Sequence, residues 1–178
     1  MRKMKILYLI GFIFFVSSCE QNEIAIDQHL PGEINSTQIP LGQNYSRQIF
    51  YNLKNNSVIS VNQKTEWDLG FESNEAGWRI IINSATFSQL AKVGSIDFNS
   101  EINIDTLNWT WDNPRGINFG TAFGDYRNKE ELYILDKGFN LDGSSRGYKK
   151  IMIDSVNNNS YFISYANIDN TNSQTIEI

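Results

Sequence analysis

Residues 65–71 read Thr-Glu-Trp-Asp-Leu-Gly-Phe and have the clearest strand pattern in the chain. Trp67, Leu69 and Phe71 alternate with residues that are polar or lack a side chain. Successive side chains of a β-strand point to opposite faces, so a period of two is typical of a strand with one buried face. We therefore predict a half-buried strand over residues 65–71.

Similar runs lie on both sides of this strand. Residues 47–53 (RQIFYNL) and 58–61 (VISV) flank a polar turn, which predicts a β-hairpin. Further strands are predicted at residues 78–83 (WRIIIN) and 107–111 (LNWTW), although the rest of 84–131 has no clear pattern. The last third reads as a meander, with strands over residues 132–136, 148–156, 161–166 and 174–178.

No run of ten or more residues has a convincing helical period, and the many Asn and Ser residues favour turns over helices. The sequence therefore predicts an all-β fold, either an antiparallel barrel or a sandwich, with a C-terminal β-meander and little helix. The chain ends on the apolar-alternating segment QTIEI without a closing turn. We expect from this that the domain is truncated at its C-terminus, which would leave an unpaired sheet edge.

The first nineteen residues have the pattern of a lipoprotein signal. A basic start with Arg2, Lys3 and Lys5 precedes an apolar run over residues 6–16, which is too short for the roughly 20 residues of a membrane-spanning helix. Val-Ser-Ser-Cys follows at residues 16–19, and it predicts cleavage before Cys19 and lipid attachment to that residue. We predict a protein anchored by lipid in the outer membrane, facing the cell surface or the periplasm.

The mature chain is acidic and divides into two parts. Removing residues 1–18 takes away three of the 15 basic residues and none of the 20 acidic ones, which leaves a net charge of −8. Such a chain does not attract nucleic acid. Residues 19–44 are polar and interrupted by Pro and Gly, so we predict a flexible tether there and a β domain over residues 45–178.

The residues needed for common catalytic sites are missing. His29 is the only histidine and lies in the predicted tether, where no third group can orient it for nucleophilic catalysis. Cys19 is the only cysteine, so zinc ligands are also lacking. The carboxylates Glu66, Asp68 and Glu72 read as the solvated face of a strand. We predict a protein that is not an enzyme and has no metal site.

Aromatic residues are the remaining candidates for a functional site. Those in regular strands are expected to be core residues, whereas those in the irregular middle of the chain are better placed for binding. We select Tyr126, Trp111 and Phe119 as candidate ligand-binding residues. Flat apolar or sugar-like ligands are held by such side chains.

The strand pattern resembles the HmuY family, which consists of secreted or surface lipoproteins of Bacteroidetes. The likeness rests on residues 47–61, the segment Glu-Trp-Asp-Leu-Gly-Phe at 66–71, the strand 78–83 and the closing meander 132–166. It covers most of residues 47–166. The resemblance implies an all-β domain and, for the best-known members, a haem-binding protein that passes haem to an outer-membrane receptor.

The resemblance does not carry over to a haem site. In the best-known members two histidines, or in some relatives two methionines, ligate the iron from the segment that corresponds to residues 84–131. This chain has no His or Met there, and Met152 is its only methionine after cleavage. Tyr126 is left as a phenolate ligand for ferric haem. Three functions therefore stay open: haem uptake, a structural or protein-interaction module without a cofactor, and a carbohydrate-binding accessory.

Overall fold

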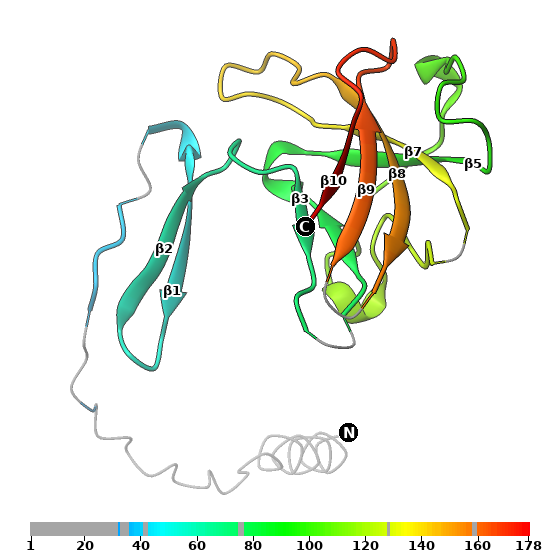
Figure 1. The fold of residues 1–178 in the computed structure, drawn as a ribbon. Helices are drawn as coiled ribbons and strands as arrows, with labels where there is room; N and C mark the ends of the chain where they lie inside the picture. The colour runs from blue at the N-terminus through cyan, green and yellow to red at the C-terminus, as the bar shows by residue number, and fades with distance from the viewer. Residues whose placement is uncertain (1–31, 33–35, 41–42, 75–76, 128, 158–159) are drawn as a thin grey trace, which may run out of the picture. The chain divides into compact units, whose positions relative to one another are not determined.

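A six-stranded antiparallel sheet forms the centre of the fold in the computed structural model (Figure 1), with the strand order β10-β9-β8-β7-β5-β6. The strands are β5 (Gln89–Gly94), β6 (Trp109–Thr110), β7 (Leu132–Asp136), β8 (Tyr148–Val156), β9 (Tyr161–Ala166) and β10 (Gln174–Glu177). The strands from β7 to β10 are neighbours in chain order, which confirms the C-terminal meander.

Two smaller sheets complete the fold. The first pairs β1 (Arg47–Asn52) with β2 (Ser57–Gln63), and the second pairs β3 (Leu69–Phe71) with β4 (Ile80–Ile82). Helical structure in the described residues is confined to short 3-10 turns at Gln43–Tyr45, Ser84–Thr86, Ile104–Thr106 and Ile117–Phe119. The all-β prediction is confirmed, and the arrangement is a sandwich rather than a closed barrel.

The structure describes residues 32, 36–40, 43–74, 77–127, 129–157 and 160–178. The chain divides into two units, Met1–Gln38 and Ile39–Ile178, and the strands of the described residues all lie in the second. Cys19 and His29 lie outside the described residues. Within the described part, no helix has the length and apolar character needed to cross a membrane.

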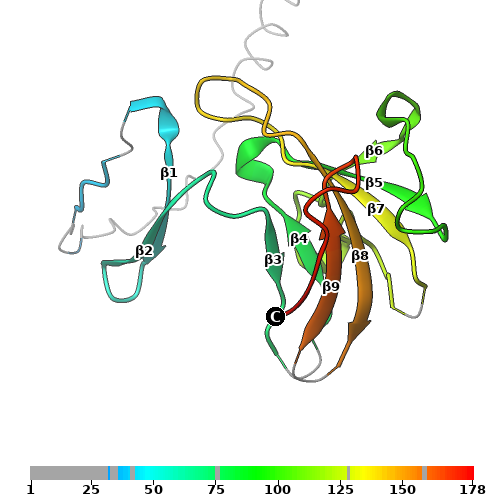
Figure 2. The ribbon, with the colours of Figure 1, turned by 45° about the horizontal axis from the view of Figure 1, so that its top comes forward.

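One face of the six-stranded sheet is covered by apolar side chains, and we call it the apolar face. Cross-strand partners share a face, so Leu90, Leu135 and Lys149 lie on the same side, as do Tyr133 and Ile151. The buried cluster on this face also includes side chains from β4 and from the segment before β7: Ile80, Ile82, Phe123 and Tyr126. Figure 2 shows β3 and β4 beside the strand β9 of this sheet.

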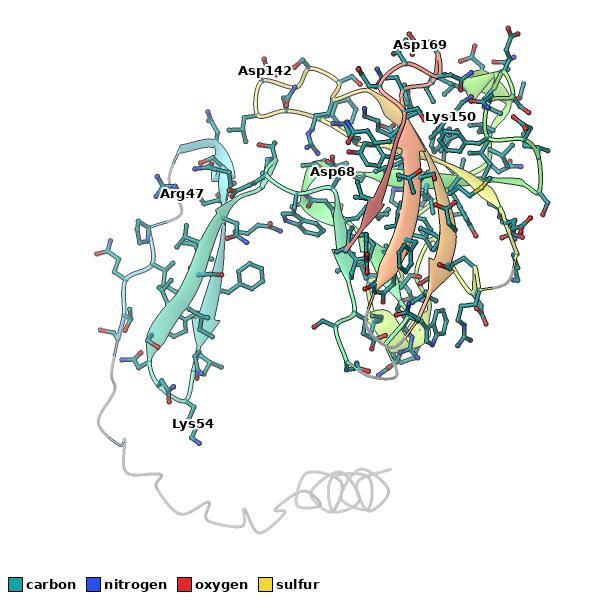
Figure 3. The ribbon with its side chains drawn as sticks, in the orientation of Figure 1. Arg47, Lys54, Asp68, Asp142, Lys150 and Asp169 are labelled. Atoms are coloured by element: carbon teal, nitrogen blue, oxygen red, sulfur yellow. The ribbon has the colours of Figure 1, made fainter. Side chains whose placement is uncertain are left out.

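The opposite face of the sheet is covered by a loop that bonds to the buried ammonium of Lys150, and we call it the lysine face. Ile134 pairs with Lys150 and with Ala91, and all three are fully buried. The Lys150 ammonium donates to the carbonyl oxygens of Phe98 (3.3 Å) and Ser100 (2.5 Å). The loop after β5 is thereby held over the sheet (Figure 3).

Three predicted strands are markedly shorter than the sequence pattern indicated, and one of them, predicted over residues 78–83, is reduced to Ile80–Ile82. The strand predicted over residues 65–71 begins only at Leu69. The reason is that the Asn83 side-chain amide donates hydrogen bonds to the carbonyl oxygens of Lys64 and Trp67, each at 2.7 Å. A backbone bent around one amide group cannot remain in an extended ladder. The strand predicted over residues 107–111 is reduced to two residues, Trp109–Thr110.

Strand β5 was not predicted. Leu90 lies on the apolar face and Ala91 on the lysine face, and both are buried because both faces of the sheet are covered. A strand buried on both sides has no alternation of apolar and polar residues, so the period of two that identified the other strands is absent.

Candidate functional site

Tyr126 is a core residue. Its side chain is 3% exposed and packs edge-on against Phe123 and Trp78. The hydroxyl donates a hydrogen bond to the carbonyl oxygen of Trp78. Burial raises the pKa of the Tyr126 hydroxyl well above its usual range, so the phenolate form is disfavoured. A buried, protonated and hydrogen-bonded phenol is poorly suited to ligating iron.

Trp111 and Phe119 lie far more exposed, on the loop of residues 111–120. Their side chains are 61% and 59% exposed. The guanidinium of Arg115 lies 5.8 Å from the centre of the Phe119 ring. The structure therefore separates the three predicted aromatic residues: two lie on a surface loop and Tyr126 lies in the core. Among the four described clefts, Tyr126 lines one, and Trp111 and Phe119 line none.

Asp112 holds the base of this aromatic loop in place. One carboxylate oxygen accepts from the backbone N–H of Ile82 at 2.8 Å, and the other accepts from that of Ala122 at 2.7 Å. A further backbone bond joins Asn113 to the carbonyl of Gly120 at 3.1 Å. Because Ile82 belongs to β4, the loop is fixed to the core at both ends, and its exposed aromatic side chains are preorganised.

A second feature lies at the seam of the sandwich, between β3 and β10, and we call it the seam groove. It has a volume of about 330 Å³. Its lining is mostly apolar and comprises Leu69, Phe71, Leu135, Ile151, Ile163, Tyr165, Ile176 and Ile178, with Asp68 and Lys149 at one end. Pockets of this size and composition are common ligand sites. The sequence marked these residues as strand positions but gave no sign that a groove lies between them.

Charged side chains surround one end of the seam groove. The Asp68 carboxylate (Figure 3) lies 2.8 Å from the Arg146 guanidinium and 3.6 Å from the Lys137 ammonium. Lys149 donates to the side-chain oxygen of Asn167 at 2.6 Å. Two cations thus pair with the groove-lining Asp68, and Lys149 lines the groove as well, so positive side chains outnumber the carboxylate at this end.

A third, more polar cleft of about 550 Å³ lies near the end of β8. Its lining includes Arg127, whose guanidinium lies 4.0 Å from the centre of the Trp78 ring and 2.8 Å from the Asp125 carboxylate. The hydrogen bond from Arg127 lowers the pKa of Asp125 to about 2. The Arg127 side chain therefore already has two partners, the Asp125 carboxylate and the Trp78 ring.

Haem ligation of the kind implied by the resemblance does not fit the residues present. Residues 84–131 contain neither His nor Met, and Tyr126 is buried. Met152 lies on β8 opposite Leu132, which places its side chain on the lysine face. Among the described residues, no group of three His, Cys, Asp or Glu side chains is arranged to hold a metal ion.

Comparison with protein families finds a match to the family described as HmuY protein, over residues 44–177. Comparisons with curated proteins and with solved structures give no match. The match spans most of the chain and nearly the whole of the unit that carries the strands. The chain therefore belongs to the HmuY family.

Proposed function

We propose that this protein is a non-catalytic surface module of the HmuY type, anchored by lipid at Cys19, which binds a protein partner through the aromatic loop. Family membership supports a haem-binding-type surface protein at the level of the family. The signal pattern that ends at Cys19 supports anchoring in the outer membrane. An outer-membrane receptor, the partner implied by the family, is the protein that the module would contact.

The bracing of the aromatic loop by Asp112 is the observation that carries this proposal. Exposed aromatic side chains are enriched at the centres of protein interfaces. Binding is favoured when those side chains are already held in place, because less conformational entropy is lost. Trp111 and Phe119 meet both conditions, since they are exposed and their loop is bonded to β4 through Asp112.

Photo-crosslinking in cells tests the interaction. A photoreactive phenylalanine analogue at position 111 is expected to give one discrete adduct with a membrane protein. The same analogue at Leu53, which is also exposed, serves as the control and should give none. In a Cys19→Ser background the protein should leave the membrane fraction and the adduct should disappear. Equal adducts from positions 111 and 53 would argue against the aromatic loop as the contact surface.

Haem binding is the function that family membership suggests, but the residues present do not support it. Because the residues present offer no suitable axial pair, hemin added to the mature domain at micromolar concentration should give no saturable shift of the Soret band. A saturable shift with one hemin per chain would contradict this expectation. Loss of such a shift in Tyr126→Phe or Met152→Ala would then identify the ligand.

A further inference from the structure

The seam groove is bordered by two strands that run side by side without pairing. Figures 1 and 2 both show β3 next to the end of β10, with the two strands running in the same direction. Leu69 and Phe71 line one wall and Ile176 and Ile178 the other, above the buried Ile163. The groove is separate from the aromatic loop, whose residues do not line it.

The edge of β3 that borders the groove has unpaired backbone groups. Asn83 donates to the carbonyl of Asp68 at 3.1 Å, and Glu72 donates to the carbonyl of Arg79 at 3.0 Å. Backbone bonding alternates along an antiparallel pair, so residues 68, 70 and 72 bond toward β4. The N–H and C=O groups of Leu69 and Phe71 therefore point away from β4, and no backbone partner for them is found among the described residues.

The edge of β10 is unpaired in the same way. Tyr161 and Ile178 exchange two backbone hydrogen bonds, each of 2.9 Å. By the same alternation, Gln174 and Ile176 bond to β9, while the backbone groups of Thr175 and Glu177 point away from it. Within the described part of the chain, β10 has β9 as its only strand neighbour. Two open strand edges thus border one apolar groove.

We propose that the seam groove accepts an extended polypeptide strand, which lies antiparallel to both β3 and β10. Alternate apolar side chains of this strand pack on Ile151 and Ile163, and its backbone bonds to the free edges of the groove. An extended peptide carries regularly spaced donors and acceptors on both sides, which a free lipid or an aromatic molecule does not. The free N–H and C=O groups on the edges of β3 and β10 can bond to the two sides of such a peptide.

The charges at the two ends of the groove set the direction and composition of the peptide. Lys149, with Lys137 and Arg146 close by, lies at the end where β3 begins. Glu177 lies on β10 at the other end, on the face opposite to that of Ile176 and Ile178, where its carboxylate accepts from the Ser160 hydroxyl at 2.6 Å. A strand antiparallel to β3 and β10 has its N-terminal residue beside Glu177 and its C-terminal residue near Lys149. The preferred peptide therefore begins with a basic residue, alternates apolar and polar residues, and ends with an acidic residue.

Titration of the full mature chain with the synthetic peptide KVTITVE tests the proposal. We expect saturable binding with one peptide per chain, measured by calorimetry. The peptide EVTITVK, with exchanged end charges, should bind at least tenfold more weakly. A version of KVTITVE that is N-methylated at alternate backbone amides should also lose at least tenfold, because methylation removes the donors for the strand edges.

Two matched variants locate the site on the protein. Ile178→Asp places a charge on the groove wall at a side chain that is already 49% exposed, and it should weaken binding at least tenfold. Ile59→Asp makes the same change on β2, where the side chain is 67% exposed, and binding should be unchanged. Urea unfolding of both variants checks that the fold is intact.

Three results would overturn the proposal. The first is no saturable binding of KVTITVE by the wild-type chain. The second is equal binding of the N-methylated peptide, which would mean that the groove does not use the strand edges. The third is displacement of the peptide by decanoate at a similar concentration, which would identify the groove as a site for small apolar molecules.

Discussion

The two faces of the central sheet are closed by different kinds of interaction. The apolar face is covered by a cluster of aliphatic and aromatic side chains, whereas the lysine face depends on a buried ammonium that bonds to a loop. Lys149 and Lys150 make the contrast plain, because they are neighbours on β8 and point to opposite faces. Lys149 is partly exposed and lines the seam groove, while Lys150 is fully buried.

The two faces differ in how strongly their stability depends on a single side chain. Apolar packing is spread over many side chains and tolerates changes that conserve volume. A buried charge requires specific partners, since leaving polar groups without them is costly. Lys150 has three such partners, the carbonyls of Phe98 and Ser100 and the side-chain oxygen of Asn170 at 2.6 Å. The Asn170 amide also donates to the carbonyl of Asn99 at 2.9 Å, which links a second loop to the first.

Replacing Lys150 tests this contrast with the largest expected effect. Lys150→Met keeps most of the side-chain volume but leaves three oxygen acceptors without their donor, so we expect a loss of about 3 kcal/mol in the free energy of unfolding. Lys149→Met is the matched control, and because the partly exposed Lys149 ammonium bonds to the Asn167 amide oxygen and lies 5.9 Å from the centre of the Tyr165 ring, its loss should cost less than about 1 kcal/mol. Urea unfolding followed by tryptophan fluorescence measures both. Equal losses would mean that the lysine face does not depend on Lys150.

A smaller effect is expected from the tyrosines of the apolar face at alkaline pH. Burial raises the pKa of the Tyr133 hydroxyl well above its usual range, and so does the hydrogen bond that this hydroxyl donates to Glu131 at 2.8 Å. Burial likewise raises the pKa of Tyr126. Below pH 10 both the folded and the unfolded chain keep these protons, so the tyrosines give no slope of stability with pH. Above about pH 10 the unfolded chain loses them first, and stability falls as the pH rises.

The slope is limited to about 1.4 kcal/mol per pH unit for each tyrosine. Urea unfolding at several pH values between 9 and 11 measures it. Tyr133→Phe should be flatter than wild type over this range, whatever its stability at neutral pH. A slope that is identical in wild type and Tyr133→Phe would show that this hydroxyl does not contribute.

Strand positions were predictable where a strand has one covered face. The meander from β7 to β10 matches the sequence pattern closely, and so does the hairpin of β1 and β2. The pattern failed for β5, which is covered on both faces, and for the start of the strand predicted at residue 65. There the deciding contact is the Asn83 amide, which bonds to two carbonyls 16 and 19 residues earlier in the chain.

The candidate site was predictable only in part. Trp111, Phe119 and Tyr126 looked alike in the sequence, as aromatic residues in an irregular segment. Tyr126 is buried because its ring packs against Phe123 and Trp78. Trp111 and Phe119 are exposed on the loop that Asp112 bonds to β4. Aromatic character alone does not distinguish the two outcomes, since burial depends on what other segments place around the ring.

The sequence alone was enough for the β class and most strand positions, and it predicts a signal that ends at Cys19, because all of these depend on patterns within a few neighbouring residues. Only the tertiary structure decided that Lys150 is buried and Lys149 is not, and that β3 and β10 border a groove with two open edges. These features depend on groups that are far apart in the chain, such as Phe98 and Lys150 or Leu69 and Ile176. Local periodicity fixes the direction of each side chain, whereas the folded chain determines what that side chain meets.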